Sequence, residues 1–155
     1  MRWLCVSSVA CSLLLGCGGG DDDDGGAAIA ATPLSGKVGG QGWALAVAQT
    51  DAFLSDDQNF WVDLYAEAPA SECGAPASGN SVIVKVPRKT GTYPLSLERN
   101  GTFLVEQQST SDNLIATRGS VRVDEVTSTT LRGGLSMTYD ANNSVNGTFQ
   151  AVVCP

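Results

Sequence analysis

The chain contains no histidine among its 155 residues, and this absence removes several kinds of chemistry at once. A Ser-His-Asp triad, a Cys-His dyad and a histidine-based metal site all require an imidazole. Aromatic residues make up only 6% of the chain, and 9 Lys and Arg residues stand against 16 Asp and Glu residues. This negative balance argues against binding to nucleic acid, and against binding to an anionic membrane surface through a basic patch.

The chain also lacks an apolar run of the ~20 residues that a membrane-spanning helix needs. The uncharged segment 4–15 follows Arg2 and has the length of the apolar region of a secretory signal peptide. It leads into Leu14-Leu15-Gly16-Cys17, which resembles the lipobox of bacterial lipoproteins. The resemblance implies that residues 1–16 are a signal peptide cleaved before Cys17, and that the Cys17 sulfur is lipidated. Two or three acyl chains would make a stable membrane anchor.

Residues 17–33 are predicted to form the lipidated cysteine and a flexible acidic tether. Glycines at 18–20 and 25–26 are flexible, and the four aspartates at 21–24 repel one another. The Asp run is interpreted as a solvated spacer, with a surface-sorting signal and a calcium-binding tract as alternatives. Because Gly18 rather than Asp follows Cys17, the inner-membrane retention signal of enterobacterial lipoproteins is not matched. The expected location is therefore the outer membrane, on its periplasmic face or at the cell surface.

Cysteine is scarce in the part of the chain that remains after processing. Cys5 and Cys11 leave with the signal peptide, and Cys17 is consumed by lipid. Cys73 and Cys154 are left as an even pair in an oxidising compartment, which predicts a disulfide, with two free buried thiols as the alternative. No further Cys or His ligands exist for a metal, so neither a metal site nor a cofactor is expected.

Residues 34–155 are predicted to form one all-β domain. Short segments rich in β-branched and aromatic residues alternate apolar and polar positions and are bounded by Gly, Asn, Asp and Pro. The predicted strands cover residues 60–65, 81–86, 102–105, 113–117, 120–126, 131–139 and 145–153. This spacing predicts an antiparallel β-sandwich or barrel with mostly meander connections and one disulfide.

Several local features refine this prediction. Residues 140–143 read as the turn between the last two strands, and Asn100-Gly101 as a second hairpin turn. Gly133 and Gly147 fall on apolar faces, which predicts a close approach or a bulge where the sheet curves. The segment 43–54 is ambiguous, because its alternation suits a strand and its alanines suit a short helix.

Some of these residues together resemble a loose group of small secreted bacterial lipoproteins whose members are uncharacterised. The shared features are a Gly-rich start before an aromatic at 36–43, a mid-chain cysteine at Cys73, and the Gly-x-Tyr segment at 91–93. The last feature is a final strand of the type V-x-G-x-F-x-A-x-x-C at 145–154. The resemblance implies a lipoprotein with a β-fold and a disulfide, and it carries over no active site.

Candidate catalytic groups are few. Ser-Lys chemistry would depend on Lys37, Lys85 or Lys89, and no S-x-x-K motif is present. The nearest carboxylate pairs of glycosidase type are Asp56-Asp57 and Asp124-Glu125. Neighbouring residues on a strand point to opposite faces, so Asp124 and Glu125 are not expected to converge. The chain is therefore predicted not to be an enzyme.

Two binding motifs have simpler explanations. Asp140, Asn142 and Ser144 place oxygen ligands at alternate positions, but Val145 stands where an EF-hand loop needs glycine, and a hairpin turn explains the same residues. Trp43 and Trp61 are interpreted as core or partner-facing aromatics, because a carbohydrate platform needs exposed, coplanar rings.

The expected function is that of a non-catalytic domain of the bacterial envelope, structural or partner-binding. Its partners would be the membrane, through Cys17, and an envelope protein or a glycan. The alternatives are an acidic inhibitor of a basic hydrolase such as lysozyme, steered by charge, and a calcium- or glycan-binding module.

Overall fold

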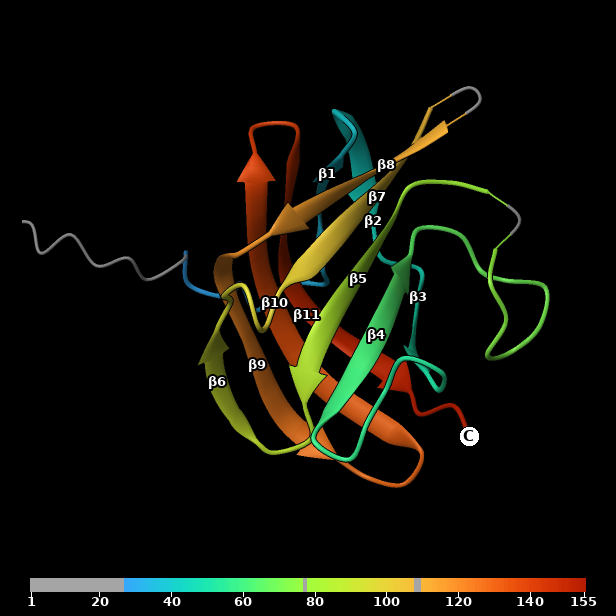
Figure 1. Ribbon diagram of the computed structural model, residues 1–155, viewed down its shortest axis with the longest axis vertical. Coiled ribbons are helices and arrows are strands. Elements are labelled where there is room, and N and C mark those ends of the chain that lie inside the picture. Colours follow the sequence, from blue (N-terminus) through green and yellow to red (C-terminus); the bar gives the residue numbers. More distant parts are fainter. Residues whose placement is uncertain (1–26, 77, 108–109) are drawn as a thin grey trace, which may run out of the picture.

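The computed structural model describes residues 27–155, apart from 77 and 108–109. It forms one 11-stranded sheet that curls strongly into a half-barrel (Figure 1). No helix occurs in the described ranges, which confirms the all-β prediction. Within the same ranges, no helix is long and apolar enough to cross a membrane.

The strands follow one another closely along the chain. They are β1 (Ser35–Val38), β2 (Gln41–Ala44), β3 (Val47–Asp51), β4 (Asn59–Tyr65), β5 (Ser81–Pro87), β6 (Gly91–Pro94), β7 (Gly101–Gln107), β8 (Thr110–Ala116), β9 (Arg118–Val126), β10 (Thr130–Asp140) and β11 (Asn143–Val152). Their order across the sheet is β6-β9-β10-β11-β3-β4-β5-β7-β8, and β1 pairs with both β2 and β11.

Most neighbours in this sheet are consecutive in the chain, as a meander requires, but the sheet is mixed rather than antiparallel. The last strand, β11, runs parallel to β3 and pairs with it at Val152 and Gln49. The predicted antiparallel pairing therefore holds for the other strand pairs, and this parallel contact makes the sheet mixed. Parallel neighbours are joined by a long crossover rather than a hairpin, so no local turn signal announces them.

The alternation predicted for 60–65 is confirmed in β4. Phe60, Val62 and Leu64 are buried in the core, whereas Trp61 and Asp63 on the opposite, outer face are only partly buried. The other large, fully buried side chains include Leu34, Phe103, Leu131, Leu135 and Met137. Each such side chain contributes ~1.5–3 kcal/mol through burial, which makes this core the main source of stability.

The seven predicted strand segments are all strands, but two local predictions change. The ambiguous segment 43–54 holds the end of β2 and the whole of β3, followed by a turn at 52–54. The hairpin turn predicted at Asn100-Gly101 is wrong, because Gly101 begins β7, which pairs with β5 and β8, while β6 pairs with β9. Residues 95–100 therefore connect β6 and β7, which are not neighbours in the sheet. The local turn residues are the same whether the two strands that they join pair with each other or not.

The turn predicted at 140–143 joins β10 and β11, and the Asp140 side chain accepts the backbone N–H of Asn142. Both predicted glycine effects are present. The pairing of β10 with β9 shifts its register between Arg132 and Gly133, as a bulge does. Gly147 lies so close to the chain at Thr32 and Leu34 that a Cβ there would be 2.6 Å from backbone atoms of both.

The segment that enters the domain is attached to β11. The Asn146 side chain donates to the Ala28 carbonyl and accepts the Ala30 N–H, and the Thr32 carbonyl accepts the Thr148 N–H. Residues 28–33, assigned from the sequence to the flexible tether, are therefore held against the sheet. Cys17 and the rest of the predicted signal and tether up to residue 26 lie outside the described residues.

Candidate functional site

The predicted disulfide between Cys73 and Cys154 is confirmed. The two Cα atoms are 5.8 Å apart, inside the ~7 Å limit for a bridge. Cys73 lies in the connection between β4 and β5, and Cys154 follows the last strand. The bridge thus joins a long surface loop to the end of the chain. The other predicted site residue, Cys17, lies outside the described residues.

The bridged loop covers the outer face of β3. We call residues 66–76 the covering loop. Its Gly74 carbonyl accepts a hydrogen bond of 2.8 Å from the Gln49 side chain, and the Thr50 hydroxyl accepts one of 2.9 Å from the Cys154 N–H. Gln49 is only 5% exposed although it lies on the outer face. The covering loop therefore shields the Gln49 side chain from water, and the bond to Thr50 holds the end of the chain that carries Cys154.

A cleft of about 330 Å³ lies beside this cover, and we call it the disulfide cleft. It is lined by Gln49, Thr50, Asp51, Ala52, Asp63, Tyr65, Cys73, Gly74, Ala75, Cys154 and Pro155. The two carboxyl groups come from neighbouring strands, β3 and β4. Sequence reasoning missed this pair, because Asp51 and Asp63 meet only through strand pairing and no motif links them.

The environment of the cleft changes the acidity of its groups. Burial, and secondarily the negative charge of Asp51, raises the pKa of Asp63 to about 6. Burial and the charge of Asp63 also raise the pKa of Tyr65. Near neutral pH the cleft therefore holds a partly buried carboxylate whose charge is unfavourable to the folded state.

This carboxylate predicts a pH dependence of stability. The folded pKa of Asp63 lies above the ordinary value of 3.8, so the folded state binds the proton more tightly than the unfolded chain does. The free energy of unfolding should therefore fall as the pH rises from about 4 to about 6. Asp63→Asn stays neutral, and we expect it to be more stable than the wild type above pH 6, by on the order of 1 kcal/mol after solvent screening.

The matched control is Asp57→Asn, which removes an exposed charge. Urea unfolding of the three proteins between about pH 4 and pH 7 gives the comparison. Asp57→Asn should change stability by less than ~0.5 kcal/mol and keep the wild-type pH dependence. A constant difference between Asp63→Asn and the wild type at every pH would contradict the assignment.

The cleft continues into the connection between β3 and β4, which we call the Phe53 loop (residues 52–58). Asp51 lines the cleft and also organises the loop, because its side chain accepts hydrogen bonds of 2.8 Å from the N–H groups of Phe53 and Leu54. Its backbone carbonyl accepts the N–H of Ser55. The Ser55 hydroxyl in turn accepts the N–H of Trp61 at 3.0 Å.

The second half of the loop is held in the same way. The Asp56 side chain accepts hydrogen bonds of 2.7 Å from the N–H groups of Gln58 and Asn59. These bonds lower the pKa of Asp56. Arg88 donates its N–H to the Gln58 carbonyl and its side-chain Nε to the Asp56 carbonyl. Hydrogen bonds thus fix both halves of the loop.

The fixed loop exposes apolar side chains. Phe53 is 93% exposed and Leu54 is 45% exposed. Phe and Leu are among the side chains most often buried. Here two of them, adjacent in the chain, lie at the surface of a hydrogen-bonded loop. Asp56 and Asp57 are exposed nearby. This arrangement is suited to contact with another molecule, and sequence analysis had considered Asp56-Asp57 only as a catalytic pair.

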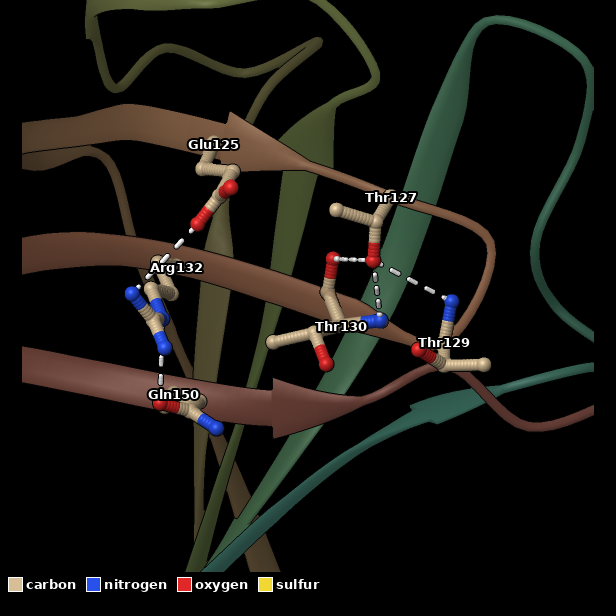
Figure 2. A network of polar contacts seen from close by, with 6 residues as sticks. All are labelled: Glu125, Thr127, Thr129, Thr130, Arg132 and Gln150. Atoms are coloured by element: carbon tan, nitrogen blue, oxygen red, sulfur yellow. Dashed lines mark hydrogen bonds and ion pairs between the residues drawn. The ribbon is translucent and has the colours of Figure 1, made fainter.

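The second carboxylate pair considered from the sequence is engaged elsewhere. Asp124 forms an ion pair of 2.7 Å with Arg122, and Glu125 one of 3.5 Å with Arg132. Figure 2 shows Arg132 between Glu125 and Gln150, spanning β9, β10 and β11, next to the turn that the Thr127 hydroxyl holds. Exposed ion pairs contribute ~0–1 kcal/mol each. Asp124 and Glu125 thus each pair with an arginine on the sheet surface and do not form a catalytic pair.

The candidate binding residues Trp43, Asp140 and Asn142 have structural roles. Trp43 is 5% exposed, and its ring N–H donates to the Asn80 carbonyl, so it is a core residue rather than a carbohydrate platform. Asp140 and Asn142 form the β10–β11 hairpin turn. Within residues 27–155, apart from the three positions left undescribed, no group of three or more acidic or cysteine side chains is placed to hold a metal.

Comparison with known proteins finds no family model, no curated protein and no solved structure that matches this chain. The candidate site therefore consists of the disulfide cleft and the adjoining Phe53 loop, connected through Asp51. The cleft offers a partly buried carboxylate, and the loop offers an exposed apolar tip with acidic neighbours. Both features are suited to binding.

Proposed function

We propose that this chain is a non-catalytic domain of the bacterial envelope, anchored in the membrane through lipid on Cys17. The observation that carries the proposal is the Cys73–Cys154 disulfide, which is typical of proteins that fold in an oxidising compartment. The lipobox-like Leu14-Leu15-Gly16-Cys17 supports both export and anchoring. The domain would act near the membrane, within reach of its tether, as a structural or partner-binding element.

The domain's layout supports this role. The described chain begins on the left of Figure 1, whereas the C-terminus and the β3–β4 connection lie on the right. A domain tethered at its N-terminal end would therefore present the β3–β4 connection and the C-terminus away from the start of the described chain. At the proposed outer-membrane location, an envelope protein or glycan could bind to this exposed side of the domain.

The anchor gives the most direct test. Cys17→Ser removes the sulfur that would carry the lipid, so the protein should remain as an unprocessed or soluble form and take up no labelled fatty acid. The wild type should incorporate the label and partition into detergent with the membranes. Cell fractionation and fatty-acid labelling measure both effects.

The matched control is Cys11→Ser, which changes another cysteine of the predicted signal peptide and should leave labelling intact. Equal labelling and membrane partition of Cys17→Ser and the wild type would contradict the anchor. Hydrolase activity of the pure protein that disappears in Asp63→Asn would contradict the non-catalytic role.

A further inference from the structure

We propose that the Phe53 loop is a docking element that inserts Phe53 into an apolar pocket on a basic protein of the envelope. The inference rests on the proposed function, because it assigns the partner-binding role to one loop of the anchored domain. The exposed ring of Phe53, at 93%, is the primary observation. Aromatic side chains that enter a partner's pocket are the residues that most often dominate the energy of a protein interface.

The loop is already held in a defined conformation. The Asp51 carboxylate and the Ser55 hydroxyl fix the first half, and Asp56 and Arg88 fix the second. A loop that is ordered before binding loses little conformational entropy when it docks. These hydrogen bonds therefore favour binding through the rigid tip, as they leave Phe53 and Leu54 free to make contact.

Charge selects the kind of partner. Asp51 at the end of β3 precedes the apolar tip, and Asp56 and Asp57 follow it in the loop. The chain as a whole has a formal net charge of −7. Two cations, Lys85 and Arg88, lie close by, but Arg88 is committed to the loop carbonyl of Asp56 and packs over the Phe60 ring at 3.9 Å. A basic surface around an apolar pocket complements this tip, and long-range attraction would speed association.

The same charges argue against a lipid surface. An apolar loop tip that enters an anionic membrane is normally surrounded by cations. Here three carboxylates, Asp51, Asp56 and Asp57, stand against the two neighbouring cations, Lys85 and Arg88. The loop also lies on the side of the domain away from the start of the described chain, where the anchor would be (Figure 1). A protein partner is therefore favoured over the membrane.

The test places a photoreactive side chain at the loop tip of the full lipidated protein in cells. Phe53→p-benzoylphenylalanine keeps an aromatic ring at the tip, and Leu97→p-benzoylphenylalanine is the matched control, since Leu97 is 83% exposed on a different turn. We expect irradiation to give one discrete adduct from position 53, none from position 97, and a partner of basic isoelectric point. The yield should fall when Asp57→Asn is added or the salt concentration is raised.

Once the cross-linked partner has been identified and purified, its affinity for the wild type and for the variants measures the contribution of Phe53. Phe53→Ala should weaken the affinity by about 30-fold, the loss typical of an interface hot spot, whereas Leu97→Ala should change it less than about twofold. Equal adducts from both positions, adducts to lipid, adducts between two copies of this chain, or no adduct would each overturn the inference. Fatty-acid labelling of Cys17 is measured separately. A negative cross-linking result with normal labelling would therefore contradict the docking proposal alone, and absent labelling would contradict the anchor.

Discussion

Removal of the disulfide by the paired substitution Cys73→Ala and Cys154→Ala is expected to lower the free energy of unfolding by about 4 kcal/mol. The bridge closes a loop across a sequence separation of 81 residues, and a loop of that length strongly restricts the unfolded chain. Such a loss is comparable to the whole net stability of a small domain. The melting temperature should fall by about 10–20 °C.

The bridge also has a local task. It ties the covering loop and the chain end together beside β3, where the Gln49–Gly74 and Thr50–Cys154 hydrogen bonds also hold them. Without it, water should reach the disulfide cleft, and the pKa of Asp63 should fall towards its ordinary range because burial is what raises it. Asp63→Asn should then add little stability to the bridge-free protein.

Urea unfolding is compared for the wild type, the bridge-free protein, Asp63→Asn and the bridge-free protein with Asp63→Asn. It measures the stability loss without the bridge, and the departure from additivity measures the interaction between the two sites. A stability loss below ~1 kcal/mol would contradict the first expectation. Full additivity of Asp63→Asn with the loss of the bridge would contradict the second. Alkylation of Cys73 and Cys154 in the unfolded, unreduced protein would show that the bridge does not form.

A second large effect is expected from Gly147→Ala, at about 3–5 kcal/mol of lost stability. Gly147 has a φ of +148°, which side chains rarely adopt, and its Cβ would lie 2.6 Å from the Thr32 carbonyl oxygen and the Leu34 Cα. The close contact arises because the entering chain pairs with β11 at Thr148. Leu34, which is fully buried, would have to move.

The matched control is Gly42→Ala, because a Cβ at Gly42 meets nothing within 4 Å. Its stability should be unchanged or raised by less than ~1 kcal/mol. Denaturant unfolding compares the two variants, and hydrogen exchange at Thr148 shows whether the entering segment has detached. A loss below ~1 kcal/mol in Gly147→Ala would contradict the close approach.

The sequence determined what depends on neighbouring residues along the chain. Period-two alternation identified β4 and the long strands β10 and β11, because side chains on a strand alternate between two faces. The turn at 140–143 followed from residues that tolerate unusual backbone angles. Counting cysteines identified the bridge between Cys73 and Cys154, since the expected processing left only two to pair.

The tertiary structure decided which strands are neighbours, and with that the candidate site. Alternation reports the two faces of one strand but not its partners, so the parallel contact of β3 with β11 and the separation of β6 from β7 had no local signal. Asp51 and Asp63 converge only because β3 pairs with β4. In the sequence, Phe53 is one of several apolar residues in an ambiguous segment. Its exposure depends on its place in the connection between β3 and β4. Burial and pairing depend on contacts between residues far apart in the chain, which single-sequence patterns do not contain.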